Sequence, residues 1–96
     1  MTRYAARRDL THREIVTGLR SLGWRVLELD GVIDLLVCVG DDVYAVDCKT
    51  PKSGTGRLEL TDAQTALIAD GWPLILATSA QDAADQIAAR RARRAA

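Results

Sequence analysis

An acid and a lysine stand where an apolar strand should continue into the core. The segment YAVDCKTPKSG begins as an apolar run, reaches Asp47 and Lys49, and then becomes a loop of Pro, Lys, Ser and Gly. Residues two apart on a strand project from the same face. The apolar run before it, VIDLLVCVG, contains a single misfit, Asp34. The three charged residues are therefore the candidates for chemistry in this chain.

The dipeptide Gly40-Asp41 joins these two runs and suits a two-residue hairpin turn with glycine at the first central position. With this turn length, Asp34 and Asp47 lie opposite each other on neighbouring strands, with their Cβ atoms about 5 Å apart. Lys49 projects from that face as well. A slip of one residue would separate the three, so the prediction that they converge depends on the turn.

Two carboxylates at this distance repel unless one takes a proton or a cation binds between them. Lys49 offsets part of the charge, and a hard divalent ion such as Mg²⁺, which prefers oxygen ligands, would offset more. A purely structural alternative is a buried Asp47–Lys49 pair that sets the strand register, with Asp34 solvated at the end of its strand. The residues alone leave both interpretations open.

Apolar periodicity and turn residues predict seven elements around these residues. Their order, α-β-β-β-α-β-α, predicts an α/β (α+β) fold with a mixed central sheet flanked by helices. The expected helices span 11–23, 60–71 and 80–94, the expected strands span 24–29, 32–40, 42–49 and 73–79, and 51–59 is a loop.

The chain has 96 residues, 48% of them apolar and 27% charged, as in an ordinary globular domain. We expect one domain over 1–96, with a core at about 11–88 and an Arg-rich tail at 89–96. No apolar run is long enough for a membrane span or a secretory signal, which favours the cytoplasm. The two cysteines, Cys38 and Cys48, suggest neither a disulfide scaffold nor zinc, and we expect buried free thiols.

The net charge of zero conceals a strong asymmetry. Residues 1–25 carry six Arg against two acids, and residues 90–96 carry four Arg and no acid. The intervening part has an excess of acidic residues. This pattern suits a cation-binding centre flanked by arms for a polyanion. Solvated helix ends would produce the same pattern.

The spacing of Asp34 before Asp47-Cys48-Lys49 resembles the signature of the PD-(D/E)xK nucleases. The wider layout is more specific: HREIVTGLRSLGWRV, GVIDLLV, YAVDCKTPKSG and LELTDAQTALIADGWPLILATSAQDA together look like the small stand-alone VRR-NUC-type nucleases of phages and bacteria. The resemblance covers about residues 11–88. It implies a restriction-endonuclease-like core.

The resemblance also implies roles for the central residues. Asp34 and Asp47 would ligate Mg²⁺ or Mn²⁺, with the backbone carbonyl of Cys48 as a third ligand. Lys49 would position the attacking water or stabilise the transition state. Two positions depart from the family pattern: Ile33 stands where a proline usually precedes the first Asp, and Asp47 replaces the more common glutamate.

Two further residues have competing interpretations. By resemblance, Glu14 would bind a second metal or orient a metal-bound water, and Gln64 would support the site from the following helix. The patterns T-x-x-E from Thr11 and T-x-x-Q from Thr61 are also capping boxes, which would hold each side chain at its helix start. Both roles stay open for Glu14, whereas capping is favoured for Gln64. His12 is expected on the surface.

Several basic residues are candidates for DNA contacts. Lys52 and Arg57 belong to the Gly-rich loop after the motif, where side chains and backbone amides can reach phosphates. The loop could equally be a simple connector. Arg13 in the first helix and the C-terminal Arg90 and Arg91 would bind the phosphate backbone without sequence preference.

Together these features predict a Mg²⁺- or Mn²⁺-dependent DNA endonuclease. The resemblance implies a structure-specific enzyme that cuts branched DNA, similar to Holliday junction resolvases, and acts as a homodimer in a bacterial cell or a phage-infected host cell. A homodimer would place two active sites on two strands. The alternative is a non-catalytic or partner-dependent nucleic-acid-binding module on the same fold.

Overall fold

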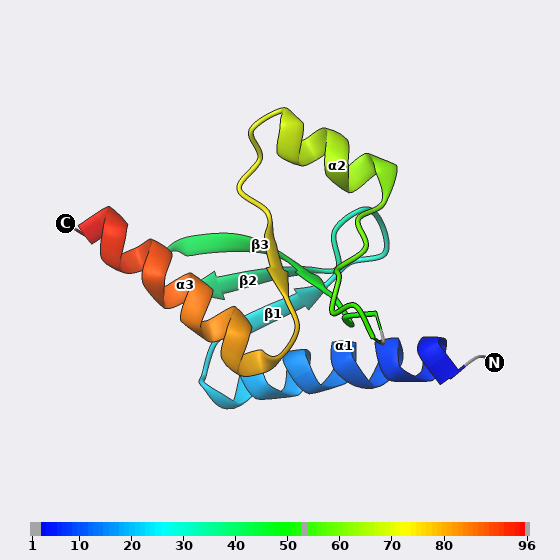
Figure 1. Cartoon of the computed structure of the whole chain (residues 1–96). Coiled ribbons are helices and arrows are strands. Elements are labelled where there is room, and N and C mark those ends of the chain that lie inside the picture. The colour runs from blue at the N-terminus through cyan, green and yellow to red at the C-terminus, as the bar shows by residue number, and fades with distance from the viewer. Residues whose placement is uncertain (1–2, 53, 96) are drawn as a thin grey trace.

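The computed structural model describes residues 3–52 and 54–95 (Figure 1). Its elements follow the predicted order, and the fold is α+β with a four-stranded mixed sheet and three helices. The helices are α1 (Arg3–Ser21), α2 (Asp62–Ala69) and α3 (Ala80–Ala95), and the strands are β1 (Arg25–Glu28), β2 (Leu35–Val39), β3 (Asp42–Cys48) and β4 (Ile75–Ala77).

The strands are ordered β1-β2-β3-β4 in the sheet, with the first two pairs antiparallel and β3-β4 parallel. The β2-β3 register pairs Val39 with Asp42 and Leu35 with Val46. Gly40 adopts a φ of 63°, as the first central residue of a two-residue hairpin turn of this kind requires. The hairpin register predicted from the turn length is therefore confirmed.

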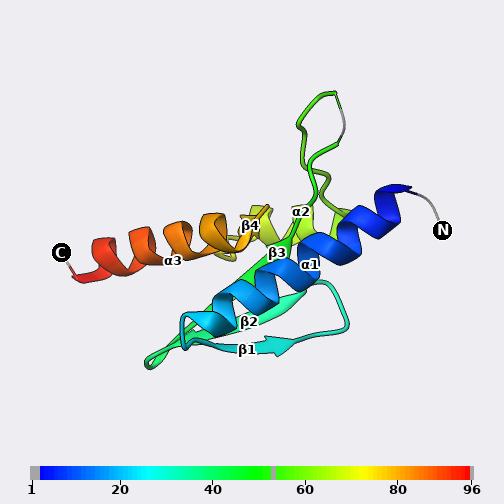
Figure 2. The ribbon, with the colours of Figure 1, turned by 90° about the horizontal axis from the view of Figure 1, so that it is seen from below.

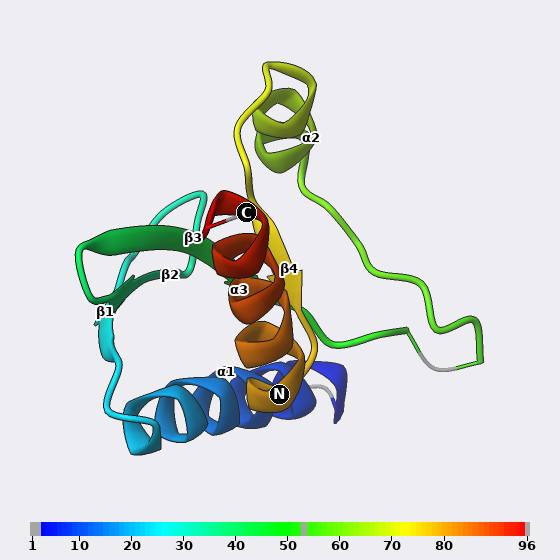
Figure 3. The ribbon, with the colours of Figure 1, turned by 90° about the vertical axis from the view of Figure 1, so that its left-hand side faces the viewer.

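Helices α1 and α3 pack against each other and cover one face of the sheet (Figures 2 and 3). The core between these layers consists of aliphatic side chains, namely Ile15, Val16, Leu19, Leu35, Val37, Val46, Ile75, Ala77, Ala83 and Ile87. Helix α2 stands apart from both helices near the end of the sheet, and the long connection from β3 to α2 extends away from the sheet (Figures 1 and 3). This end of the sheet carries Asp47 and Lys49.

Helix α1 begins at Arg3, about two turns before the predicted start. The expected capping box at Thr11 is therefore wrong, because Thr11 lies inside the helix. The preceding residues 3–10 contain no Gly or Pro and include Ala, Arg and Leu, which favour helix. At the other end of the chain, the Arg-rich residues 89–95, expected as a tail beyond the core, form the last turns of α3, in agreement with the helix predicted over 80–94. No helix among the described residues has the length and apolar character that a bilayer crossing requires.

Helix α1 approaches α3 closely at Gly18, where a Cβ atom would lie only 2.3 Å from the Cβ of Ala80. We predict that Gly18→Val lowers the free energy of unfolding by about 2 kcal/mol or more, because the helices must separate to admit the side chain. Urea unfolding measures this loss. Thr17→Val, at an exposed position of the same helix, should change stability by less than about 0.5 kcal/mol. Equal effects of the two substitutions would contradict this packing.

Candidate active site

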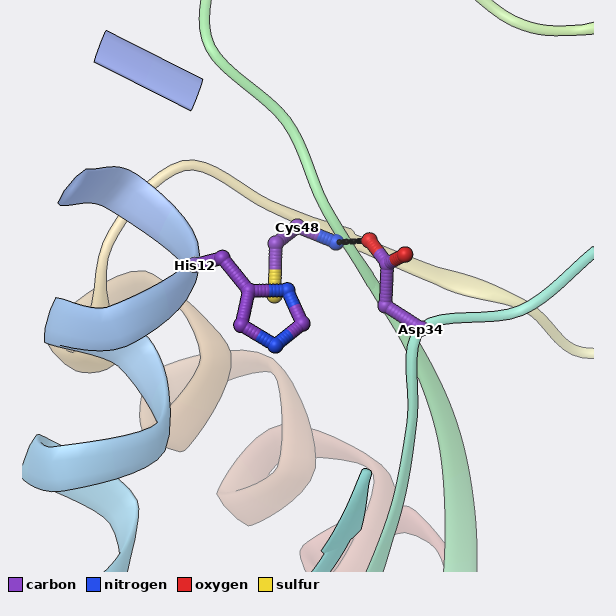
Figure 4. Close-up of side chains that lie close together, drawn as sticks. All are labelled: His12, Asp34 and Cys48. Atoms are coloured by element: carbon purple, nitrogen blue, oxygen red, sulfur yellow. Dashed lines mark hydrogen bonds between the residues drawn. The ribbon is translucent and has the colours of Figure 1, made fainter. Parts of the chain in front are cut away.

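Asp34, Asp47 and Lys49 converge at the end of the β2-β3 hairpin that lies away from its turn. Asp34 immediately precedes β2, and its Oδ2 accepts a hydrogen bond of 2.8 Å from the backbone N–H of Cys48 (Figure 4). The Nζ of Lys49 lies 2.9 Å from Oδ2 of Asp47. Because the hairpin register holds both strand ends together, these groups form one cluster.

The cluster carries more negative charge than Lys49 neutralises. Asp47 is only 2% exposed and forms a buried ion pair with Lys49. Burial raises the pKa of the Asp34 carboxyl, and the neighbouring Asp47 raises it further, while the hydrogen bond from Cys48 and the charge of His12 act in the opposite direction. An elevated pKa means that the protein environment opposes the second negative charge. Such a pair of carboxylates favours a proton or a metal cation.

Gln64 is the residue that connects α2 to this cluster. It is 3% exposed, and its Oε1 accepts hydrogen bonds from Lys49 Nζ at 2.8 Å and from the backbone N–H of Thr61 at 3.1 Å. Its Nε2 donates to the carbonyl of Val32 at 2.9 Å. Thr61 completes the capping box by accepting from the N–H of Gln64. The sequence presented capping and contact with the cluster as alternatives for Gln64, and its side chain makes both sets of hydrogen bonds.

Removing the Gln64 side chain should loosen both α2 and the lysine. We predict that Gln64→Ala lowers the free energy of unfolding by about 1–3 kcal/mol, since it deletes half of a capping box and leaves buried polar partners unpaired. Urea unfolding measures the loss. The exposed Gln81, which bonds to Asp85 on the surface of α3, is the matched control, and Gln81→Ala should cost less than about 0.5 kcal/mol.

A cleft of about 1050 Å³ opens over the cluster. Asp34, Asp47, Lys49 and Gln64 line its floor, and the β3–α2 connection contributes Lys52 and Arg57. Lys52 forms an exposed ion pair with Glu59 at 2.5 Å. Arg8 of α1 also lines the cleft and was missed from the sequence. It lies two helical turns before the buried Ile15, a spacing that could have identified it had the helix been extended to Arg3.

Glu14 does not join the cluster. Its side chain is exposed on α1, and it is not one of the described residues that line the cleft. An α-helix turns by about 100° per residue, so Glu14 lies well to one side of Ile15, which faces the core. The suggested roles of Glu14, as a cap at a helix start or as a ligand at the site, both lack the geometry they need.

The C-terminal arginines are engaged at the opposite end of the sheet. Arg91 donates to Asp42 Oδ2 at 2.8 Å, and Arg90 donates to the carbonyl of Pro73 at 2.7 Å. Asp42 is the first residue of β3, so it lies five residues, or about 16 Å, from Asp47. The positions of Arg90 and Arg91 therefore do not support the expected contacts with DNA. Both side chains instead bind other parts of this chain.

His12 lies closer to the cluster than its expected surface position. Its Nε2 is 3.0 Å from Oε1 of Glu28, and its ring lies near the Cys48 thiol and the Asp34 carboxylate (Figure 4). His12 precedes Val16 of the apolar face by four residues, so the two lie on the same side of the helix. This spacing could have predicted that His12 faces the sheet. The neighbouring Arg13 is exposed and lines a separate hollow of about 340 Å³ beside His12.

No protein-family model, curated protein or solved structure matches this chain. The functional assignment therefore depends on the motif, the geometry of the cluster and the charges around its cleft.

Proposed function

We propose that this chain is a Mg²⁺- or Mn²⁺-dependent DNA endonuclease of the PD-(D/E)xK type that hydrolyses phosphodiester bonds. The observation that carries the proposal is the meeting of Asp34, Asp47 and Lys49 on the floor of one cleft, at the end of a hairpin with the expected register. A buried ion pair that only set the strand register would not need Asp34 beside it.

The residues present fit a hard divalent cation. Two carboxylates offer oxygen ligands, and the Cys48 carbonyl follows directly after Asp47 in the chain. The raised pKa of Asp34 supports the assignment, because a bound cation would offset both the burial of this carboxylate and its repulsion by Asp47. Asp47 in place of the more common glutamate has a shorter reach, and its burial beside Lys49 matches that shorter arm.

When bound, a divalent cation would supply a more acidic, polarised water for attack on phosphorus. Asp34 and Asp47 would hold this cation in the cleft. Gln64 accepts a hydrogen bond from Lys49 and keeps its ammonium at a defined place, where it can stabilise the charge that develops on the phosphate. The chain thus provides carboxylate ligands for the metal, the positively charged ammonium of Lys49, and the Gln64 side chain that fixes this ammonium in place.

Binding of the polyanion would fall to the basic residues of the cleft. Arg8 on one side and Lys52 and Arg57 on the other line the same space as the carboxylates. Long cationic side chains contact phosphates and position a nucleic acid without reading its bases. This arrangement favours recognition of DNA shape over sequence, and we propose branched DNA, such as a four-way junction, as the substrate. We place its action in the cytoplasm of a bacterial or phage-infected cell.

The sheet face opposite α1 and α3 suits a homodimer. Leu27, Leu36 and Ala45 pair in register across this face, and Leu27 is 58% exposed. A second copy of the chain would bury this apolar row by an isologous contact and bring two clefts into one particle. We propose this dimer as the active form.

We predict that Leu27→Glu converts the dimer into a monomer, because it places a charge at the most exposed end of the apolar row. Size-exclusion chromatography with light scattering measures the mass. Leu22→Glu is the matched control, since Leu22 is 54% exposed directly after α1 and lies outside the row. A monomeric wild-type protein, or a dimer that survives Leu27→Glu, would contradict the proposed interface.

The substrate class is tested by incubating the protein with a four-way junction, a fork, a linear duplex and a supercoiled plasmid, each with Mg²⁺, Mn²⁺ or EDTA. Metal-dependent cleavage with preference for the junction or fork is expected. Cleavage that continues in EDTA would overturn the metal-dependent mechanism. Tight DNA binding with no cleavage in either metal would instead support the non-catalytic or partner-dependent module.

A further inference from the structure

We infer that this chain has a second metal site, formed by His12, Asp34 and Cys48. It would bind an ion that prefers imidazole and thiolate ligands, such as Zn²⁺, and this ion would block the hydrolytic site by occupying Asp34. The existence of the binding site is argued from geometry alone. Its inhibitory role rests on the proposed nuclease function.

The three potential ligand atoms already lie close together. One atom from each of His12, Asp34 and Cys48 lies within 4.8 Å of the others. Ligands of a tetrahedral zinc ion, at about 2.0–2.3 Å from the metal, are about 3.3–3.8 Å apart. The ligand atoms would therefore have to approach one another by about 1 Å to bind such an ion. The three residues come from α1, from the position just before β2 and from the end of β3, and all three elements pack in the core.

The orientation of His12 fits a zinc ligand. Its Nε2 is bonded to Glu28 Oε1 at 3.0 Å, and its other ring nitrogen lies on the side of the Cys48 sulfur (Figure 4). A carboxylate on the far nitrogen of a metal-bound histidine fixes the tautomer and strengthens the ligand. Glu28 occupies this supporting position, so the set contains three ligands and a carboxylate behind one of them.

The charge around Cys48 favours a dication. The carboxylates of Asp34, Asp47 and Glu28 lie around the half-buried Cys48 side chain. Their negative charge attracts a divalent ion towards the sulfur, and a bound ion would replace the thiol proton.

Asp34 is shared between the two sites. Asp47 and Cys48 are adjacent on β3, so their side chains project from opposite faces of the strand. Asp34 accepts from the N–H of Cys48 and lines the cleft beside Asp47, and it thus lies between the faces. A zinc ion that takes Asp34 from one face removes a ligand from the magnesium site on the other. Zn²⁺ should therefore compete with Mg²⁺ and not with DNA.

Cobalt is the probe for binding, because a Co²⁺–thiolate bond gives a charge-transfer absorption band. Titration of the reduced wild-type protein with Co²⁺ should produce this band at one ion per chain, and Zn²⁺ should abolish it. His12→Gln should weaken Co²⁺ binding at least about tenfold, and Cys48→Ser should remove the band. Cys38→Ser, which changes the other free cysteine, is the matched control and should retain it.

The proposal of this metal site is refuted if the wild-type protein gives no thiolate band, or if the band is lost equally in Cys38→Ser and Cys48→Ser. Circular dichroism of each variant establishes that it is folded, and His12→Gln provides an independent ligand removal if Cys48→Ser unfolds. These binding data decide the site whether or not the protein cleaves DNA.

The inhibitory role is tested by cleavage of a four-way junction at fixed Mg²⁺ with increasing Zn²⁺. The wild-type enzyme should lose activity and regain it at higher Mg²⁺, and His12→Gln should need at least about tenfold more Zn²⁺ for the same loss. Zinc that binds the wild-type protein without slowing its cleavage would overturn the inhibitory role. Absence of cleavage before zinc is added would count against the proposed nuclease alone.

Discussion

Replacement of Lys49 by methionine is expected to reduce Mg²⁺-dependent cleavage of branched DNA by about 10²- to 10³-fold, the usual loss when one fixed charge-stabilising donor is removed. The lysine ammonium lies on the cleft floor, held by Asp47 at 2.9 Å and by Gln64 at 2.8 Å. Methionine preserves most of the side-chain volume and removes the charge. Single-turnover cleavage with saturating enzyme measures the effect on the chemical step apart from DNA binding.

The matched control for this substitution is Lys52→Met, which removes a lysine three residues later in the same cleft. Lys52 is exposed and pairs with Glu59, so its loss should weaken DNA binding and change the single-turnover rate by less than about tenfold. Lys49→Met also leaves Asp47 buried without its partner, which lowers stability, so circular dichroism must show that the variant is folded. A folded Lys49→Met protein that cleaves at the wild-type rate would refute the role given to Lys49.

Asp34→Asn is expected to abolish metal-dependent cleavage and, in the absence of metal, to raise the melting temperature at neutral pH. The carboxylate is a metal ligand in the proposed site, but without metal it is partly buried and repelled by Asp47. Asparagine removes the negative charge, and its side-chain oxygen can still accept the hydrogen bond from Cys48. Loss of activity together with a gain of stability is the signature of a residue retained for function.

The pH dependence of this effect follows from the raised pKa of Asp34. When the folded-state pKa of an acid exceeds its unfolded-state value, ionisation destabilises the folded state in full above the folded-state pKa. The penalty decreases as the pH falls below that pKa and is absent below the unfolded-state value. The advantage of Asp34→Asn in melting temperature should therefore shrink on acidification. Asp30→Asn, at an exposed position of the same loop, is the control and should show no such advantage. A variant less stable than the wild type at neutral pH would contradict the repulsion between Asp34 and Asp47.

The sequence was sufficient for the element order and for the central cluster because both depend on short-range rules. The Gly40-Asp41 turn determines the hairpin pairing by counting, and the observed register is the predicted one. Gln64 illustrates a limit of these short-range rules, which predict contacts within a helix start but not contacts between distant parts of the chain. The T-x-x-Q pattern correctly predicted a capping box, but its contacts with Lys49 and Val32 depend on how α2 is placed over the sheet.

The errors involve long-range placement. The T-x-x-E pattern at Glu14 satisfies the local rule for a helix start, yet favourable helix formers before it extend α1 to Arg3, and the rotation of α1 against the sheet then turns Glu14 away from the cleft. That same rotation brings His12 towards Cys48. Similarly, the C-terminal arginines resembled free basic arms because nothing near them in the sequence indicates that Arg91 binds Asp42, 49 residues earlier.

The central claim is that Asp34, Asp47 and Lys49 form a metal-dependent site for phosphodiester hydrolysis. Its most direct test is single-turnover cleavage of an end-labelled four-way junction by the wild type, Asp34→Asn and Lys49→Met, each verified as folded, with Mg²⁺ or with EDTA. Cleavage is expected only for the wild type with Mg²⁺, with Lys49→Met reduced by about 10²- to 10³-fold and Asp34→Asn without activity. Strand cleavage that persists in EDTA, or equally in both variants, would contradict the claim.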